Sequence, residues 1–167
     1  MLTLDTTIPL LSWGDWFSII NLRDAYFHIS IHPSHQKYLR FQFKNVVYQF
    51  CSFPFGLSTA PRTFTKCMAP IVAFLRLQGI NIYPYIDDWL IVSTSYLDAM
   101  AARDTTLITL QRLGLNIDLA KSHLQPCQTV TFIGATLNSL QARAFLPQER
   151  ILKIKRAITS FRPQKSV

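Results

Sequence analysis

The sequence predicts an α+β fold, an antiparallel sheet with helices packed on one face. Short apolar runs of alternating character occur in pairs around polar turns, which is the pattern of β-hairpins. Longer segments carry apolar residues at helical spacing and begin at residues that favour helix starts. Strands and helices do not alternate with the regularity of a doubly wound parallel sheet. The chain has 167 residues, of which 49% are hydrophobic and 16% charged, so we expect one ordered domain with a core.

The first part of the chain is predicted to hold a short helix, a strand and a hairpin. The helix covers residues 2–13, and the strand covers residues 16–22. The apolar runs 39–43 and 46–50 lie on either side of Lys44-Asn45, and alternation with polar residues is clearest in 39–43. Two such runs around two turn-forming residues predict a hairpin.

The first long helix is predicted to begin at Pro61, to bend at Pro70 and to end at Gly79. Proline fits the first turn because its missing N–H is not needed there, and glycine adopts the left-handed conformation that ends many helices. The inward face should hold the apolar residues at helical spacing: Phe64, Cys67, Met68 and Ile71.

A second long helix should begin at residues 95–98, which resemble a capping box, and should end at Gly114. Strands are predicted between Thr129 and Leu137, and Pro147 should begin a last helix. The predicted inward residues of the second helix are Leu97, Met100, Leu107, Leu110 and Leu113. In the last helix, Ile151, Ile154 and Ile158 should share one face.

The pair Asp87-Asp88 is the strongest local sign of function. The apolar runs 80–84 and 89–93 flank it, so the two aspartates should occupy a tight hairpin turn. Two adjacent carboxylates repel each other and resist desolvation, and a divalent cation offsets that cost. Mg²⁺ favours carboxylate oxygens together with substrate phosphates, as in two-metal polymerases. A solvated Asp-Asp turn without function is the alternative, and these residues alone do not decide between the two.

The net charge is +8, and basic residues are concentrated near the C-terminus with no acid among them. Such a surface attracts a polyanion through counterion release, so we favour nucleic acid as the partner over a merely soluble basic face. The residues concerned are Arg150, Lys153, Lys155, Arg156, Arg162 and Lys165.

Apolar stretches, the N-terminal segment and the cysteines indicate where in the cell the protein is expected. No stretch reaches the roughly 18 apolar residues of a membrane span, and no signal peptide opens the chain. The cysteines, Cys51, Cys67 and Cys127, are far apart and odd in number, which favours free thiols in a reducing compartment. We therefore expect an intracellular protein of the cytoplasm or nucleus that is not secreted and has no membrane partner.

Several segments follow one another in the order and at the separations of a known family. They are residues 22–29, 53–64, 85–88, 113–121 and 132–135. Through them the chain resembles the polymerase palm of a retroelement reverse transcriptase over nearly all of its length. The likeness is closest to DIRS-like tyrosine-recombinase retrotransposons and more distant to gypsy-type and retroviral enzymes. It implies an RNA-directed DNA polymerase that transfers nucleotides to a primer 3′ end, using Mg²⁺ or Mn²⁺, an RNA or DNA primer–template and deoxynucleoside triphosphates.

The resemblance also implies residue roles. Asp87 and Asp88 would hold the metals. Tyr26 would exclude a 2′-hydroxyl from the incoming nucleotide, with a core aromatic as the alternative, and Lys121 would lie near the triphosphate, with a solvated loop lysine as the alternative. The implied substrate-binding set is Asp24, Ala25, Tyr26, Phe55, Gly56, Tyr85 and Lys121; the primer grip is Phe132, Ile133, Gly134 and Ala135; the contacts to the nucleic-acid backbone are Arg150, Lys153, Lys155 and Arg156.

The chain departs from the family at residue 21. The family's first motif begins with an aspartate that bridges both metals, and this chain has Asn21 there. An amide oxygen can touch a metal but adds no negative charge. The resemblance therefore implies weak cation binding at most and an inactive polymerase for this chain as written. Asp24 matches a family position near the triphosphate and would replace the lost ligand only if the backbone rearranged.

The family likeness further implies missing parts. Only 20 residues precede Asn21, so the fingers are expected to be largely missing. Residues 1–146 would be a partial palm, and residues 147–167 would start the segment leading to the thumb. Fingers, thumb and ribonuclease H regions would belong to a longer polyprotein. Three interpretations remain open: a polymerase fragment, a decayed or domesticated palm that binds nucleic acid without catalysis, and a protein-interaction module on the same scaffold.

Overall fold

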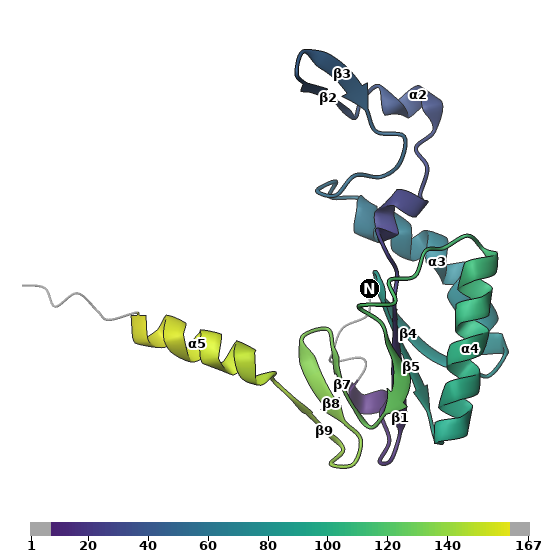
Figure 1. The fold of residues 1–167 in the computed structure, drawn as a ribbon, viewed down its shortest axis with the longest axis vertical. Helices are drawn as coiled ribbons and strands as arrows, with labels where there is room; N and C mark the ends of the chain where they lie inside the picture. The colour runs from purple at the N-terminus through teal and green to yellow at the C-terminus, as the bar shows by residue number, and fades with distance from the viewer. Residues whose placement is uncertain (1–7, 161–167) are drawn as a thin grey trace, which may run out of the picture.

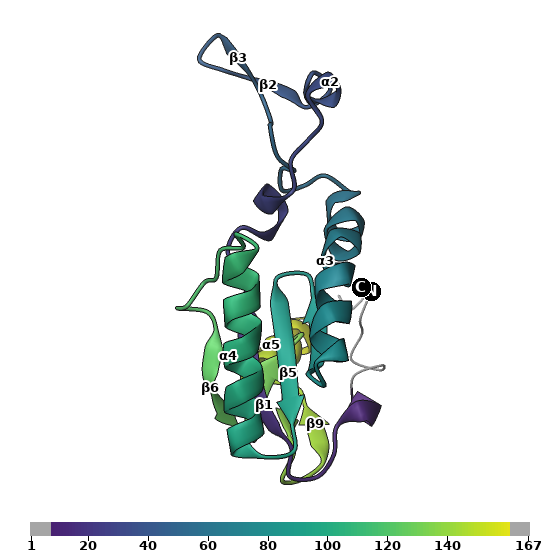
Figure 2. The same cartoon turned by 90° about the vertical axis from the view of Figure 1, so that its right-hand side faces the viewer.

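A four-stranded antiparallel sheet forms the centre of the computed structural model, which describes residues 8–160. Figures 1 and 2 show this sheet with two long helices against one of its faces. Its strands pair in the order β4, β5, β1, β6, every pair being antiparallel. The predicted antiparallel sheet with helices on one face is confirmed. The strands are β4 (Asn81–Tyr85), β5 (Asp88–Ser93), β1 (Trp16–Asn21) and β6 (His123–Cys127).

The main core lies between this sheet and the helices α3 (Ala60–Leu77) and α4 (Tyr96–Arg112). Fully buried side chains meet there from all three layers, among them Phe64 of α3, Trp89 of β5 and Leu110 of α4. Each apolar side chain of this size contributes roughly 1.5–3 kcal/mol when it is removed from water. The contact between helices and sheet therefore supplies much of the stability of the fold.

A smaller sheet covers the opposite face of the central one. It consists of β7 (Thr129–Phe132), β8 (Ala135–Asn138) and β9 (Arg143–Phe145). Its side chains form a second core with β1 and β5, made of Phe17, Ile19, Leu90, Val92, Val130, Phe132 and Leu137. Because β5 is covered on both faces, four consecutive apolar residues of this strand are buried, which is why its sequence does not alternate.

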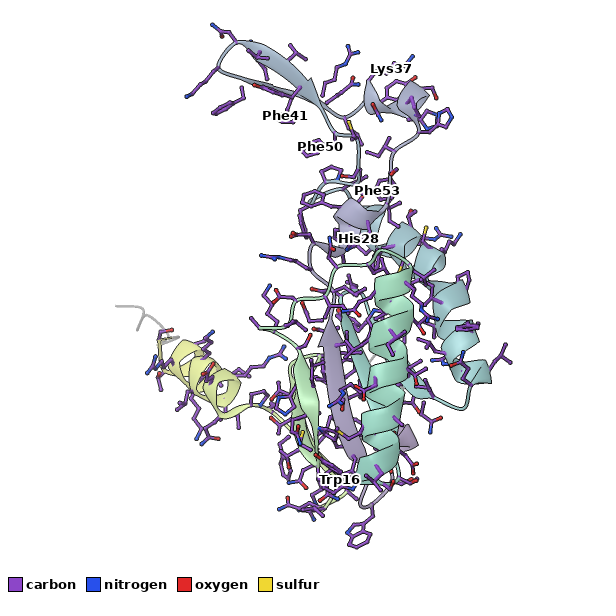
Figure 3. All side chains as sticks on the ribbon, turned by 45° about the vertical axis from the view of Figure 1, so that its right-hand side comes forward. Trp16, His28, Lys37, Phe41, Phe50 and Phe53 are labelled. Atoms are coloured by element: carbon purple, nitrogen blue, oxygen red, sulfur yellow. The ribbon has the colours of Figure 1, made fainter. Side chains whose placement is uncertain are left out.

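A hairpin unit stands away from this body. It follows the short helices η2 (Ala25–His28) and α2 (Pro33–Gln36) and consists of β2 (Arg40–Phe43) and β3 (Val46–Gln49). Figure 3 shows Phe41 and Phe50 on this unit, far from Trp16 at the other end of the molecule. Both residues of its turn are left-handed, Lys44 with φ 46° and Asn45 with φ 62°, as two-residue hairpin turns require. The predicted hairpin is confirmed.

The last helix, α5 (Gln148–Ser160), extends away from both sheets (Figure 1) and has no buried residue. The predicted helix after Pro147 is confirmed. The apolar face of this helix does not pack against the rest of residues 8–160. Ile154 and Ile158 are exposed, and Ile151 is only partly covered. Arg162 and Lys165 lie outside the described residues.

Helix α4 differs from the prediction in the face that it buries. Its start is as expected, because the Ser95 hydroxyl accepts a hydrogen bond from the Asp98 N–H at 3.1 Å. Leu97 and Leu113, however, are 77% and 56% exposed, and Met100 and Leu107 are only partly buried. The buried residues are Ala99, Thr106 and Leu110. Small side chains here let the helix lie close to the sheet, and the Thr106 hydroxyl is satisfied by the Ala102 carbonyl at 2.7 Å.

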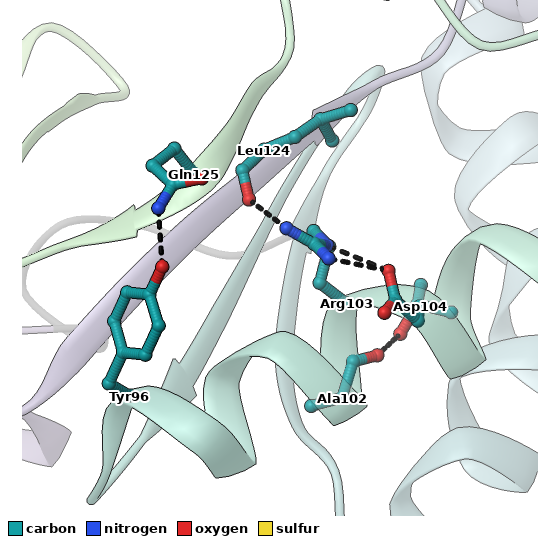
Figure 4. A network of polar contacts seen from close by, with 7 residues as sticks. Tyr96, Ala102, Arg103, Asp104, Leu124 and Gln125 are labelled. Atoms are coloured by element: carbon teal, nitrogen blue, oxygen red, sulfur yellow. Dashed lines mark hydrogen bonds and ion pairs between the residues drawn. The ribbon is translucent and has the colours of Figure 1, made fainter.

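Polar contacts tie α4 to the edge strand β6, as Figure 4 shows. The Arg103 guanidinium donates to the Leu124 carbonyl at 3.0 Å and pairs with Asp104 at 2.7 Å. The Gln125 amide donates to the Tyr96 hydroxyl. These bonds fix the end of the chain segment that carries Lys121 and Ser122.

Other predictions are corrected or limited by the structure. Only Ile8–Leu10 forms a short 3-10 turn in the described part of the first predicted helix, and residues 2–7 lie outside it. Strands β6 and β9 were not predicted. In α3, Phe64 and Met68 are buried as expected, whereas Cys67 is exposed. Pro70 lies inside α3, which continues to Leu77 as one helix; the predicted bend there stays a prediction. None of the described helices is both long and apolar enough to cross a membrane.

Candidate active site at the ends of strands β1 and β5

The turn between β4 and β5 carries Asp87. It consists of Ile86 and Asp87, and Asp88 is already the first residue of β5, opposite Tyr85. The prediction of both aspartates within the turn is therefore wrong by one residue. Ile86 has φ 51°, which is a strained conformation for a β-branched residue. The indole N–H of buried Trp89 donates to the Ile86 carbonyl at 3.0 Å and holds the turn in this shape.

Asn21, the last residue of β1, lies directly opposite Asp88. Its side-chain Nδ2 donates to Asp88 Oδ1 at 2.5 Å. The predicted position of Asn21 beside the two aspartates is confirmed. Asn21 is buried, so this hydrogen bond satisfies a polar group that would otherwise be costly to remove from water. The amide nitrogen, not a metal-binding oxygen, faces the carboxylate.

Burial raises the pKa of the Asp88 carboxyl above its ordinary value, and the negative charge of Asp87 raises it further. The hydrogen bond from Asn21 and the positive charge of Lys121 act in the opposite direction and are outweighed. This direction agrees with the repulsion and the resistance to desolvation expected of two adjacent carboxylates. The main cause is the loss of solvent rather than the neighbouring charge.

An aromatic cluster lies next to Asp87. The ring of Tyr26 is 5.3 Å from that of Phe55 and 6.0 Å from that of buried Phe64, measured between centroids. Burial raises the pKa of the Tyr26 phenol, and the charges of Asp87 and Tyr85 raise it further. Four predicted site residues, Tyr26, Phe55, Tyr85 and Asp87, therefore gather at one place.

The other residues predicted to bind substrate are arranged less closely. Ala25 is buried, and Gly56 has the left-handed φ of 89°. Asp24 is exposed with φ 52°, and within residues 8–160 its carboxylate forms no hydrogen bond or ion pair. Lys121 is mostly exposed, with its Nζ 3.6 Å from Asp118 Oδ2.

The β7–β8 turn, which contains the predicted primer grip, borders the site from the second sheet. Phe132 and Ala135 are buried, and the turn residues Ile133 and Gly134, with φ of 49° and 72°, are partly exposed. The Ile133 side chain packs against the second core. A hollow of about 390 Å³ lies where this hairpin meets the central sheet. It is lined by Asp88, Lys121, Ile19, His123, Thr129, Val130, Thr131 and Thr136.

The basic residues of α5 differ in their relation to this site. Arg150 donates from Nη1 to the Gly134 carbonyl at 3.2 Å and so connects α5 to the β7–β8 turn. Lys153, Lys155 and Arg156 are exposed along the helix. The α5 cations therefore form a surface that continues from the turn rather than part of the aspartate cluster.

Two residues at the site were missed by sequence reasoning, Asp118 and Ser122. The Asn21 N–H donates to Ser122 Oγ at 2.9 Å, and the Asp118 N–H donates to the Asn21 carbonyl at 2.8 Å. Nothing in the local pattern marks either residue, because their partner lies about a hundred positions earlier, 101 in the case of Ser122.

The donor groups present do not fit a strongly bound pair of cations. Asp87 and Asp88 are the only carboxylates that the β4–β5 turn brings together, and Asn21 presents an N–H to Asp88. In the part of the chain that the structure describes, no three His, Cys, Asp or Glu residues are grouped closely enough to hold a metal ion. A cation here would have two carboxylates from the protein and would displace the amide of Asn21.

Comparison with known proteins gives a consistent result. A family described as "Reverse transcriptase (RNA-dependent DNA polymerase)" matches residues 8–137. The Gag-Pol polyprotein of gibbon ape leukemia virus is 27% identical over 131 residues, which cover 73% of this chain and 8% of the polyprotein. The Gag-Pol polyprotein of avian reticuloendotheliosis virus is 26% identical over 162 residues, which cover 87% of this chain and 14% of that one. The chain thus spans a small part of the relatives that it matches.

Solved structures show the same fold. The foamy viral protease-reverse transcriptase in complex with an RNA/DNA hybrid has a TM-score of 0.77 and 22% identity, covering 93% of this chain and 20% of that one. The same viral protein in complex with double-stranded DNA has a TM-score of 0.77 and 20% identity, covering 93% of this chain and 31% of that one. At this level of identity the likeness establishes the architecture.

Proposed function

The chain belongs to the reverse transcriptase (RNA-dependent DNA polymerase) family, and from this premise we propose that it is a palm with a degenerate catalytic centre that holds a primer–template without extending it. The observation that carries this proposal is the hydrogen bond from the Asn21 amide to Asp88. The family resemblance puts a metal-bridging aspartate at position 21, and this chain has there a neutral donor already engaged with the neighbouring carboxylate.

The cofactor of the family would be poorly held. Mg²⁺ or Mn²⁺ would have Asp87 and Asp88 as its protein ligands, and the Asn21 N–H competes for one oxygen of Asp88. A bound cation supplies charge neutralisation in phosphoryl transfer, and this chain supplies two of the three carboxylates expected. Weak cation binding and loss of catalysis follow from the same substitution.

The substrate residues keep an arrangement that suits a nucleotide pocket. Tyr26, Phe55 and Tyr85 lie together beside Asp87, and the left-handed Gly56 follows Phe55 without a side chain. Lys121 is held by Asp118 on the side of Asp88. We therefore assign deoxynucleoside binding to this group of residues, with Phe132–Ala135 as the primer grip.

Nucleic acid is the partner that the charge distribution favours. No acid occurs between Asp24 and Asp87, a stretch that contains Lys37, Arg40, Lys44, Arg62, Lys66 and Arg76. The exposed cations of α5 add a second basic surface next to the β7–β8 turn. We expect a duplex to be bound mainly through its phosphates, and the foamy viral complexes with an RNA/DNA hybrid and with double-stranded DNA support a duplex partner for this fold.

The origin and context of the chain are part of the proposal. We assign residues 1–146 to the palm and residues 147–167 to the start of the segment that leads to a thumb, within a polyprotein that would also contain fingers and ribonuclease H regions. The assignment to a DIRS-like retrotransposon rests on the sequence motifs alone. The flanking genomic sequence tests the polyprotein context, which requires fingers and ribonuclease H regions in the same reading frame. The free cysteines support an intracellular location in the cytoplasm or nucleus.

Binding of a fluorescently labelled RNA/DNA primer–template tests the proposal, with anisotropy measured over a series of salt concentrations. We expect affinity that falls steeply with salt and depends little on sequence. Affinity that does not respond to salt, or no binding at low salt, would favour a protein-interaction module on the same scaffold.

A further inference from the structure

The end of strand β1 is held in place by a loop that belongs to neither of its neighbours in the sheet. We propose that Ser122 and Asp118 are positioning residues, which clamp the backbone of residue 21 so that its side chain meets Asp88. The importance of residue 21 rests on the proposed function, whereas the clamp itself rests on contacts within the chain.

The contacts form a closed circuit. The Asn21 N–H donates to Ser122 Oγ at 2.9 Å, and Ser122 Oγ donates to the Asp118 carbonyl at 2.7 Å. The Asp118 N–H donates back to the Asn21 carbonyl at 2.8 Å. Both backbone groups of residue 21 are therefore satisfied by one short segment of the chain.

These hydrogen bonds satisfy the backbone of β1 at the point where its pairing with β6 stops. Strands β1 and β6 pair irregularly, at Phe17 with Cys127 and at Ile19 with His123. Beyond Ile19, β6 offers no backbone carbonyl to the Asn21 N–H, and the hydroxyl of Ser122 takes that position. Because Asn21 is buried, its N–H would have no water to bond with if the hydroxyl were removed.

The clamp acts on the side of β1 that faces away from β5. On the other side, the Leu22 N–H donates to the Asp87 carbonyl at 2.8 Å, and Asn21 pairs with Asp88. The end of β1 is thus fixed between the β4–β5 turn and the segment 118–122. The same segment holds Lys121, whose backbone N–H and Nζ both approach the Asp118 carboxylate. Two residues therefore set the distances among residue 21, Asp88 and Lys121.

Solution NMR of the Asn21 side-chain amide in the full chain tests this role directly. In the unmodified protein the amide proton bonded to Asp88 should exchange slowly with solvent. The Ser122→Ala variant should lose this protection, with exchange faster by about tenfold, because one hydrogen bond of ordinary strength corresponds to that factor. Ser122→Thr, which keeps a hydroxyl, should retain the protection.

Ser139→Ala is the matched control. The Ser139 hydroxyl donates to the Asp15 carbonyl at 2.6 Å and so supports the opposite end of β1. Its removal should lower the melting temperature to a similar degree while leaving the Asn21 amide protected. Should Ser122→Ala fail to fold, the isosteric pair Ser122→Thr and Ser122→Val makes the same comparison. Protection of the Asn21 amide that is equal with and without the hydroxyl at position 122 would overturn the positioning role.

Binding of Mn²⁺ separates this inference from the proposed function. Asn21→Asp should bind Mn²⁺ more tightly than the unmodified chain, as measured by electron paramagnetic resonance. If it does not, the proposed function is contradicted at residue 21, while the exchange measurement still decides whether Ser122 positions the strand.

Discussion

At the scale of single residues, the structure shows what Asn21 does at the end of β1. Asn21 and Asp88 face each other across β1 and β5, and the amide donates to the carboxylate at 2.5 Å. A third carboxylate at this place would need a cation to offset the repulsion. The amide instead forms a neutral partner for Asp88, so the site is consistent with a protein that folds without metal.

The Asn21→Asp variant should be less stable than the unmodified protein in a chelator and should recover when Mg²⁺ is added. The change removes the donor to Asp88 and places a like charge beside it, which should cost about 1–3 kcal/mol and several degrees in melting temperature. Differential scanning fluorimetry in chelator and in Mg²⁺ measures this. Asn81→Asp, at an exposed position of β4, is the control for added charge. Equal melting temperatures for Asn21→Asp and the unmodified protein in chelator would contradict the idea.

The Asp88→Asn variant should be more stable than the unmodified protein at neutral pH. The folded pKa of Asp88 is raised, so the folded state binds this proton more tightly than the unfolded state, and the ionised carboxylate lowers stability above that pKa. The difference in unfolding free energy between the two proteins should therefore become smaller as the pH falls toward 3.8, the ordinary pKa of an aspartate. Urea unfolding from pH 7 to pH 4 measures it. A gap between the two proteins that stays constant over this range would show that the titration of Asp88 is not its cause.

At the scale of helices and strands, sequence reasoning found the elements whose pattern is local. The hairpins, the capped start of α4 and the proline-led start of the last helix follow from turn residues and caps. Strand β6 was missed because Pro126 interrupts its pattern and it pairs with β1 at only two positions. The buried face of α4 was predicted only in part. Leu110 is buried as predicted, but packing against the sheet selects Ala99 and Thr106 rather than Leu97 and Leu113.

Helix α5 should be a nucleic-acid contact surface. Replacing Lys153, Lys155 and Arg156 by alanine should reduce the slope of log affinity against log salt by about 1 for each phosphate that the helix no longer neutralises. Anisotropy with a labelled primer–template measures the slope. The control replaces Arg112 and Arg143, which are exposed outside both basic surfaces and should change the slope less. If the α5 variant binds as well as the unmodified chain at every salt concentration, this helix is not the contact surface.

At the scale of the whole molecule, the order of motifs along the chain predicts which residues meet, and the structure adds how they are held. Asn21, Tyr26 and Asp87 come together from separate segments as the motif order implies. The contribution of Asp118 and Ser122 follows only from the irregular pairing of β1 with β6, which no local pattern records. The central sheet, covered by α3 and α4 on one face and by β7–β9 on the other, has the palm architecture with Asn21 at position 21.

Primer extension with deoxynucleoside triphosphates and Mg²⁺ is the measurement that tests the degenerate catalytic centre most directly. The unmodified chain should show no measurable extension, because loss of a bridging carboxylate should lower the rate on the order of a thousand-fold or more. Robust Mg²⁺-dependent incorporation by the unmodified chain, abolished by Asp87→Ala, would contradict the account and make Asp24 the first candidate for the missing ligand.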